Sequence, residues 1–209
     1  SQEVNVMKSL LPAMVILAAI TSAPCLLQGQ IVINEVRIDQ AGTDTDEYFE
    51  LAGPPGTPLT GLMYIVIGDS SAGSGSVEAA INLFGLTMPA SGYFVAAEAS
   101  FTIGFADFTT DLNFENSDNV THMLVEGFTG AVGDDLDTND DGVLDSTPWS
   151  AIADDFALLE NPIDPATGNT SAGELVYSLN TIGPDGTFTP AHVVRCPDVS
   201  GDWEILPFA

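Results

Sequence analysis

The residues most capable of chemistry lie in one acidic stretch, Asp134 to Asp145, in which every second residue on average is an aspartate. When Asp137 is placed at position 1 of a calcium loop, oxygen donors fall at the alternating positions that such loops use, and Gly142 falls at position 6. The spacing therefore predicts a Ca²⁺ site. The expected ligands are Asp135, Asp137, Asn139, Asp141, the Val143 carbonyl and Asp145.

This stretch, called the Asp loop below (residues 134–145), is not a complete EF-hand. Position 12, which usually supplies a bidentate glutamate, is Pro148, and glycines rather than a helix precede the loop. The alternative is an acidic surface loop that faces solvent without an ion. Calcium is favoured because a carboxylate cluster without a cation repels itself. The expected dissociation constant is on the order of 10⁻⁴–10⁻³ M, as in extracellular modules.

Charge and composition limit the partners that the chain can have. The 209 residues include 30 acidic and 3 basic side chains, which gives a net charge of −27. Binding to a nucleic-acid backbone or to an anionic membrane depends on Lys and Arg, so neither is expected. An unknown protein or surface polymer is the expected partner, and the oligomeric state stays open. The 20 Gly and 13 Pro favour strands and turns over helices.

Residues 1–29 are expected to be a hydrophobic, helical leader. Met7 and Lys8 provide a positive start, residues 10–20 are apolar, and small residues follow, as in a secretory signal peptide. The true start is then Met7, and cleavage near Gly29 would release a secreted protein without a membrane span, because the apolar run is short for a bilayer. The open alternative is that residues 1–29 are retained as an anchor or assembly helix.

The two cysteines do not indicate a disulfide framework. Cleavage of the leader would remove Cys25 and leave Cys196 alone. Cys196 is then expected to be an inert core thiol or the partner of a cysteine on another segment. Catalysis by its thiol is not expected, because no activating group is recognisable around it.

Short segments of strand character, separated by turn residues, run from residue 30 to the end and predict an all-β sandwich. In the first of them, Ile31, Ile33 and Glu35 are expected on one face and the intervening residues on the other. Residues 61–68 are almost entirely apolar, which predicts a strand buried on both faces. Turns are expected at 69–76, 183–192 and 197–207. The predicted strands are 30–38, 47–51, 61–68, 77–84, 93–98, 120–127, 155–160 and 174–178.

Three motifs resemble the lamin-tail domain in its bacterial secreted form. They are IVINEV at 31–36, DEYFEL at 46–51 and MPASGYFV at 88–95. The Asp loop and residues 112–121 and 190–196 look like the extended version of that domain. The resemblance covers residues 30–209 and implies an immunoglobulin-like β-sandwich with the Asp loop as a long insertion.

The resemblance also implies a non-catalytic module of exported bacterial proteins. We therefore expect residues 30–209 to be a calcium-binding structural or adhesion module, secreted or on the cell surface. One alternative is an accessory domain of a secreted nuclease or phosphodiesterase whose catalytic part lies outside this chain, since such domains usually continue beyond a point like Ala209. A further alternative is a filament subunit that retains residues 1–29.

Other polar residues are not expected to form a catalytic site. Glu35, Glu47 and Glu50 could supply paired carboxylates, but strand alternation places Glu47 and Glu50 on opposite faces. His122 and His192 are the only histidines, too few for a zinc site of three or four ligands. Packing or surface roles are expected for both.

Overall fold

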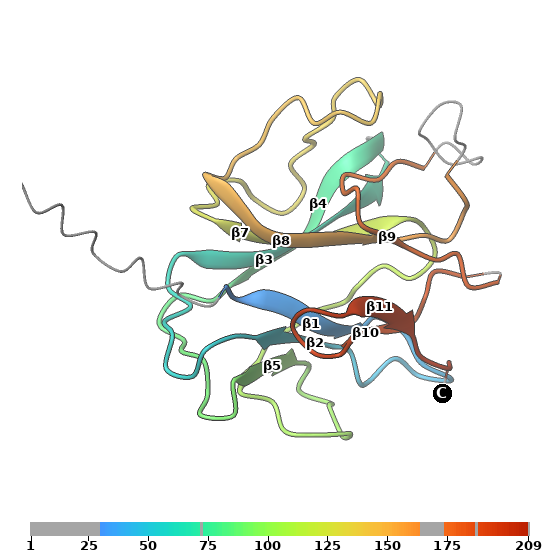
Figure 1. Ribbon diagram of the computed structural model, residues 1–209. Helices are drawn as coiled ribbons and strands as arrows, with labels where there is room; N and C mark the ends of the chain where they lie inside the picture. Colours follow the sequence, from blue (N-terminus) through green and yellow to red (C-terminus); the bar gives the residue numbers. More distant parts are fainter. Residues whose placement is uncertain (1–29, 72, 164–173, 187, 209) are drawn as a thin grey trace, which may run out of the picture.

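Two β-sheets lie face to face in the computed structural model, which describes residues 30–71, 73–163, 174–186 and 188–208 (Figure 1). The first sheet has the strand order β11-β10-β1-β2-β5-β6, and the second has the order β4-β3-β7-β8-β9. The pairing is antiparallel except between β5 and β6 and between β8 and β9. The strands are β1 (Val32–Arg37), β2 (Tyr48–Ala52), β3 (Leu62–Ser70), β4 (Gly73–Asn82), β5 (Tyr93–Ala97), β6 (Phe108–Thr109), β7 (Val120–Glu126), β8 (Ala151–Leu158), β9 (Thr181–Ile182), β10 (His192–Cys196) and β11 (Asp202–Ile205).

This arrangement confirms the prediction of an all-β fold built like a sandwich. The described part of the chain contains no helix, and a search of that part for a helix able to span a membrane found none. The predicted leader, residues 1–29, lies outside the described residues.

The main core lies between the two sheets. Phe49 of β2 and Tyr64 of β3 stack across the interface with their ring centroids 3.9 Å apart. Around this pair, inward side chains from both sheets are almost completely removed from water, which is the principal favourable contribution to folding. They include Ile33, Leu51, Phe94 and Val193 from the first sheet and Val66, Leu124, Phe156 and Leu158 from the second.

A second apolar cluster covers the outer face of the second sheet. Ile65 and Ile67 of β3 point away from the main core, and they pack with Leu136 of the Asp loop. Partly buried Trp149 and Tyr177 extend this cover. Strand β3 is therefore buried on both faces, as its apolar sequence predicts, because the Asp loop and its neighbours form a further layer over it.

Strand β1 departs from the simple alternation that the sequence suggests. Its pairing with β2 shifts between Ile33 and Glu35, which marks a β-bulge at Asn34. A bulge inserts one residue and reverses which side chains face the core. Ile33 and Val36 consequently both face the core and are fully buried. The prediction that these two side chains lie on different faces of the strand is therefore wrong.

The ends of several strands also differ from the sequence-based expectation. The predicted turn at 69–76 is largely part of the β3–β4 hairpin, because β4 begins at Gly73. Residues 174–178 were expected as a strand, yet strand structure in that region begins only at β9. Strand β11 lies within the turn expected at 197–207, and β10 occupies a stretch for which no strand was predicted; β10 is held by pairing with the distant β1, which local sequence does not reveal.

Candidate cation-binding sites

The Asp loop extends the second sheet beyond its edge strand. The amide of Val77 in β4 donates to the Asp134 carbonyl at 2.9 Å, and the amide of Leu136 donates to the Gly75 carbonyl at 2.9 Å. The loop then rises above the sheet, at the top of Figure 1. The buried Leu136 fixes its base, so backbone pairing and apolar packing together position the acidic residues that follow.

The Asp137 carboxylate is the centre of this loop. Asp137 is completely buried. Its Oδ1 accepts the amide of Asp141 at 3.2 Å, and its Oδ2 accepts the amide of Gly142 at 2.9 Å. These amides belong to positions 5 and 6 of the predicted calcium loop. Gly142 has a φ of 83°, which glycine adopts without strain and which lets the chain turn around Asp137.

Tyr177 provides the side-chain donor to Asp137. Its hydroxyl donates to Asp137 Oδ2 at 2.9 Å. Burial first, and then this hydrogen bond and the charge of Asp137, raise the pKa of Tyr177, because all of them disfavour a phenolate. Tyr177 therefore remains a neutral donor that partly compensates the buried Asp137 carboxylate.

The β3–β4 hairpin leaves room for the Asp loop at a glycine. Gly75 has a φ of 88°, and a Cβ at this position would lie 2.7 Å from Cβ of Asp137. Nearby, the amide of Ser74 donates to Asp140 Oδ1 at 2.8 Å. Residues 73–75 of this hairpin, Gly-Ser-Gly, thus contact the Asp loop directly through their backbone.

The remaining predicted ligands are only partly gathered. Asp135 Oδ1 accepts the Asp137 amide at 3.1 Å. The Asn139 side-chain amide donates to Asp141 Oδ2 at 3.1 Å. Asp145 instead accepts the amide of Thr138 at 3.0 Å. These contacts are made by amides. Among the described residues, no three carboxylates of the Asp loop place their oxygens within 4.8 Å of one another, and the Asp145 carboxylate is occupied by Thr138.

Val143, whose carbonyl was predicted to be a ligand, donates its amide to Asp141 Oδ1 at 2.9 Å. Its side chain is 67% exposed, so Val143 is not needed for the core. Its place in the loop is consistent with a backbone role, and calcium ligation by this loop stays a prediction.

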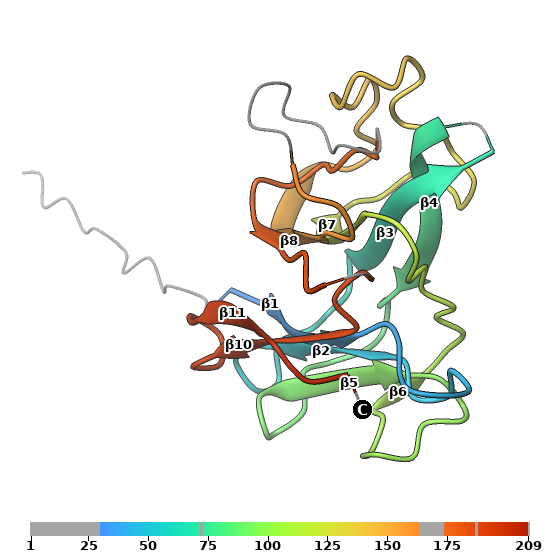
Figure 2. The same cartoon turned by 90° about the vertical axis from the view of Figure 1, so that its right-hand side faces the viewer.

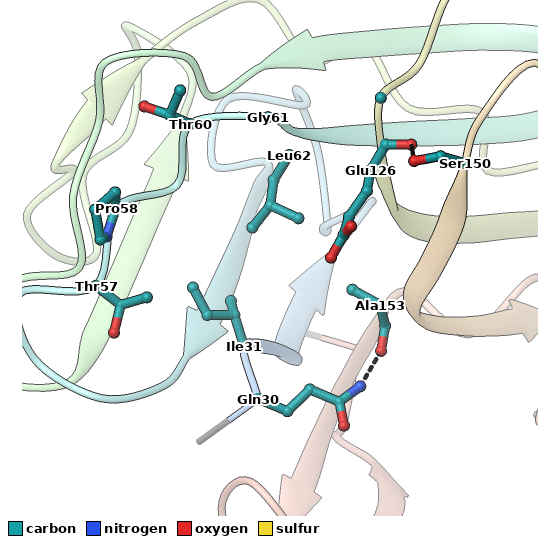
Figure 3. Close-up of a pocket in the computed structure, with 11 residues that line it drawn as sticks. Gln30, Ile31, Thr57, Pro58, Thr60, Gly61, Leu62, Glu126, Ser150 and Ala153 are labelled. Atoms are coloured by element: carbon teal, nitrogen blue, oxygen red, sulfur yellow. Dashed lines mark hydrogen bonds between the residues drawn. The ribbon is translucent and has the colours of Figure 1, made fainter. Parts of the chain in front are cut away.

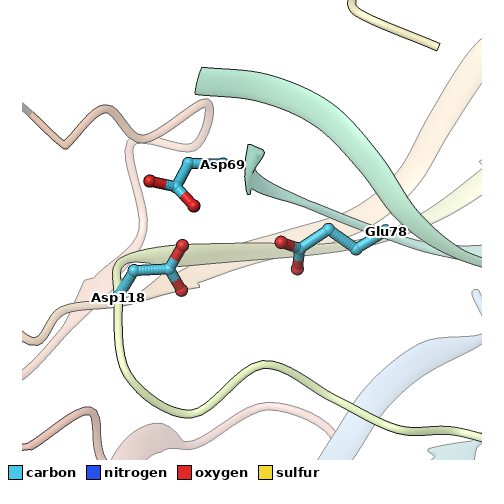
Figure 4. Close-up of side chains that lie close together, drawn as sticks. All are labelled: Asp69, Glu78 and Asp118. Atoms are coloured by element: carbon cyan, nitrogen blue, oxygen red, sulfur yellow. The ribbon is translucent and has the colours of Figure 1, made fainter. Parts of the chain in front are cut away.

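A different acidic cluster, absent from the sequence-based prediction, is tighter than the Asp loop. Asp69 of β3, Glu78 of β4 and Asp118 just before β7 place carboxylate oxygens within 4.8 Å of one another (Figure 4). Among the described residues, this is the single group of three potential metal-ligating side chains with that spacing. Asp69 and Glu78 lie on the two strands of one hairpin, so the sequence could have predicted that they are close. Asp118 is far from both in the sequence, so its proximity could not be predicted. We call this group the acidic triad.

The glutamates considered for catalysis do not meet at one site. Glu47 is buried, and its carboxylate accepts the Phe114 amide at 3.1 Å; burial raises its pKa to about 8. Glu50 bonds instead to the Asn34 side chain at 2.9 Å. Glu35 lies 2.6 Å from His192 Nε2, within a different group.

That group adds a feature which the sequence did not predict. Tyr48 donates a hydrogen bond to Glu35, and its hydroxyl lies 3.0 Å from His192 Nε2. Burial opposes ionisation of Glu35, but the hydrogen bonds from His192 and Tyr48 lower its pKa below the ordinary value. His192 therefore belongs to strand β10 and a side-chain network, and not to a turn-rich tail.

His122 and Cys196 occupy contrasting environments. His122 is completely buried, and its Nδ1 lies 2.8 Å from the Tyr64 hydroxyl, in agreement with a packing role. Cys196 is exposed at the end of β10. The expectation of a core thiol is therefore wrong, because Cys196 is the last residue of β10 and pairs there with the exposed Asp202 of β11.

A pocket of about 430 Å³ lies at one end of the sandwich (Figure 3). Glu126 is the one ionisable side chain in its lining, and Gln30 closes part of it by donating a hydrogen bond to the Ala153 carbonyl. Its other lining residues are apolar or neutral, and include Ile31 and Leu62. The carboxylate clusters therefore provide more ligand-binding chemistry than this pocket does.

Comparison of the chain with models of protein families, with curated proteins and with solved structures found no match. The geometry of the acidic residues and the motifs in the sequence are therefore the features that indicate a function.

Proposed function

We propose that this chain is an exported, non-catalytic calcium-binding module with a structural or adhesive role. The observation that carries the proposal is the environment of Asp137. A completely buried carboxylate lies in a loop that contains five further aspartates and no Lys or Arg that could neutralise them. Burying such charge is unfavourable unless it is paired or coordinates a cation.

The hydrogen bonds of the loop support calcium as the ligand. The amides at positions 5 and 6 of the predicted loop already donate to Asp137, and the side-chain amide of Asn139 donates to Asp141. A hard cation would replace the repulsion between the remaining carboxylate oxygens with attraction. The backbone of Asp145 is fixed in the loop, because its amide donates to the Leu136 carbonyl at 2.7 Å.

The proposed function of the ion is to hold the loop as a covering layer. The Asp loop supplies Leu136 to the outer apolar cluster, together with Leu144 at its far end. An ion that binds only the ordered loop adds its binding free energy to the stability of the domain. The covered second sheet would then depend on calcium.

The positions of the family-like motifs support the rest of the proposal. The motifs at 31–36, 46–51 and 88–95 fall on β1, on β2 and on the turn and strand of β5. These strands are neighbours in the first sheet, in the order β1-β2-β5. We propose on this basis an immunoglobulin-like sandwich of the lamin-tail type, on the surface of, or secreted from, a bacterial cell.

Calorimetric titration of the full chain with Ca²⁺ tests the proposal. Wild-type protein is compared with Asp141→Ala and with Asp111→Ala, which removes one exposed carboxylate outside the loop. We expect a dissociation constant on the order of 10⁻⁴–10⁻³ M, weakened at least tenfold by Asp141→Ala and unchanged by Asp111→Ala. Equal affinity in all three proteins would remove the Asp loop as the calcium site.

A further inference from the structure

The acidic triad contains a carboxylate to which no group among the described residues donates a hydrogen bond. Asp118 is only 6% exposed, and both of its carboxylate oxygens are buried without a hydrogen-bond donor. Oε2 of Glu78 is also buried and without a donor. Figure 4 shows the carboxylates of Asp69, Glu78 and Asp118 directed toward one another. Buried polar groups are nearly always satisfied in native proteins, so these oxygens indicate a missing ligand.

The backbone around Glu78 is shaped so that its carboxylate reaches the triad. The β3–β4 register shifts between Val66 and Ile67, which leaves Glu78 as an extra residue on β4. Such bulges redirect a side chain away from the regular alternation. Gly68 of β3, which pairs with Ser76, lies beside the Glu78 carboxylate, and a Cβ there would lie 2.5 Å from Glu78 Oε1. Both features allow the carboxylate to lie against the β3 backbone.

Asp118 is held in place by its neighbours in the chain and across the fold. Its carbonyl accepts the Thr189 hydroxyl at 2.6 Å. The adjacent Asn119 accepts the amides of Glu160 at 2.7 Å and Asn161 at 3.1 Å. The backbone of Asp118 is therefore fixed independently of its carboxylate, which remains directed into the triad.

Within the part of the chain that the structure describes, no Lys, Arg or His is among the charges that shift the pKa of Asp118 or of Glu78. Burial first, and then the charge of Glu78, a hydrogen bond with Asp69 and the charges of Asp69 and Glu115, together raise the pKa of Asp118 to about 9. Burial likewise raises the pKa of Glu78 to about 7. Arg195 is paired with Asp154 at 3.0 Å, away from the triad. Either a cation or a shared proton must therefore neutralise the carboxylates.

We infer that Asp69, Glu78 and Asp118 form a second divalent-cation site, separate from the Asp loop. Its ligands are all carboxylate oxygens, so it would select a hard cation such as Ca²⁺ or Mg²⁺ over a metal that prefers nitrogen or sulfur. The exposed Asp69 provides the entrance, and the buried Asp118 provides the inner wall. The ion fastens the β3–β4 hairpin to the segment that enters β7.

Equilibrium dialysis of the full chain against ⁴⁵Ca²⁺, repeated with Mg²⁺ as competitor, counts the bound ions. The test variant is Asp118→Asn with Glu78→Gln, which keeps the shapes of the side chains. The control is Asp111→Asn with Glu126→Gln, an equal loss of charge at exposed positions. At saturation, the test variant is expected to bind one ion fewer than wild type, and the control to bind the same number.

The outcomes separate this site from the Asp loop. If wild type and Asp141→Ala both bind one ion and the triad variant binds none, the triad is supported and the loop is rejected. If the triad variant binds as many ions as wild type, the second site is rejected, and a shared proton is the explanation of the cluster. Absence of any bound ion in wild type rejects both sites.

Gly68→Ala provides a test that retains every charge. The added methyl group displaces the flexible end of Glu78, not the backbone, so the fold is expected to survive. Affinity at the triad should fall at least tenfold while the Asp loop is unaffected. An unchanged ion count and affinity in folded Gly68→Ala, verified by its thermal transition, would argue against coordination by Glu78.

Discussion

Tyr177 and Asp137 are joined by a hydrogen bond of 2.9 Å that connects the segment before β9 to the base of the Asp loop. The tyrosine ring also packs against the outer apolar cluster of the second sheet. The Tyr177 side chain thus connects the outer apolar cluster to the Asp loop. The loop depends on a hydrogen-bond donor that lies outside its own sequence, so the calcium-loop motif does not reveal it.

Tyr177→Phe removes this donor and leaves the ring in place. The free energy of unfolding in chelator should fall by about 1.5–3 kcal/mol, the usual range for a hydrogen bond to a charged group. Tyr93→Phe is the matched control, because Tyr93 donates to Asp198 at 2.8 Å in an exposed position. Chemical denaturation measures both; a loss at Tyr177 no larger than at Tyr93 would show that the Asp137 contact is unimportant.

Gly75→Ala tests the close approach of the hairpin and the Asp loop. Alanine at a positive φ costs about 1–2 kcal/mol by itself. Gly56 supplies the comparison, because its φ is 78° and a Cβ there meets nothing within 4 Å. We expect Gly75→Ala to lose clearly more stability than Gly56→Ala, since its methyl group meets the Asp137 backbone. Equal losses in thermal denaturation would mean that the loop moves aside at no cost.

The buried His122 predicts a loss of stability in acid. Burial lowers its pKa from 6.5 to about 3. The unfolded chain therefore takes up a proton that the folded chain refuses, and stability falls as pH decreases below 6.5 toward 3. Between pH 6.5 and 5 this contribution is about 2 kcal/mol. Denaturation of His122→Gln across this range should show a smaller pH slope than wild type; identical slopes would contradict a neutral, buried imidazole.

Arg195 is expected to be essential for the contact between the sheets. Its guanidinium pairs with Asp154 of β8, and its Nε donates to the Ile33 carbonyl at 2.8 Å. Its Cζ also lies over the ring of Trp203, 4.4 Å from the ring centroid. Arg195→Met leaves a mostly buried Asp154 without its partner, which should cost about 3–5 kcal/mol. Adding Asp154→Asn should recover part of that loss in urea denaturation. No recovery would show that packing of Arg195, and not its charge, is what matters.

The sequence was sufficient for features that depend on local pattern. The apolar run at 61–68 correctly predicted a strand buried on both faces, and turn residues placed most of the early strands. It was insufficient where a bulge or a distant partner decides the outcome. The bulge at Asn34 reverses the alternation of β1, and β10 exists because β1 pairs with it.

The same distinction applies to the candidate sites. The Asp loop is contiguous, so its spacing could be compared directly with a calcium loop. The acidic triad depends on a bulge at Glu78 and on the packing of Asp118 beside a hairpin some forty residues earlier in the sequence. Asp118 precedes an Asn and follows a Ser, with no neighbouring residue that marks it as a ligand.

Thermal unfolding of the full chain in millimolar Ca²⁺ and in chelator tests the central claim, that cations stabilise this fold, most directly. At a free Ca²⁺ concentration ten times the dissociation constant, each site adds about 1.4 kcal/mol, which corresponds to a rise of a few degrees for a domain of this size. We predict such a rise, and its reversal when chelator is added. Identical melting temperatures in the two conditions would contradict this claim and mean that neither acidic cluster holds an ion that stabilises the fold.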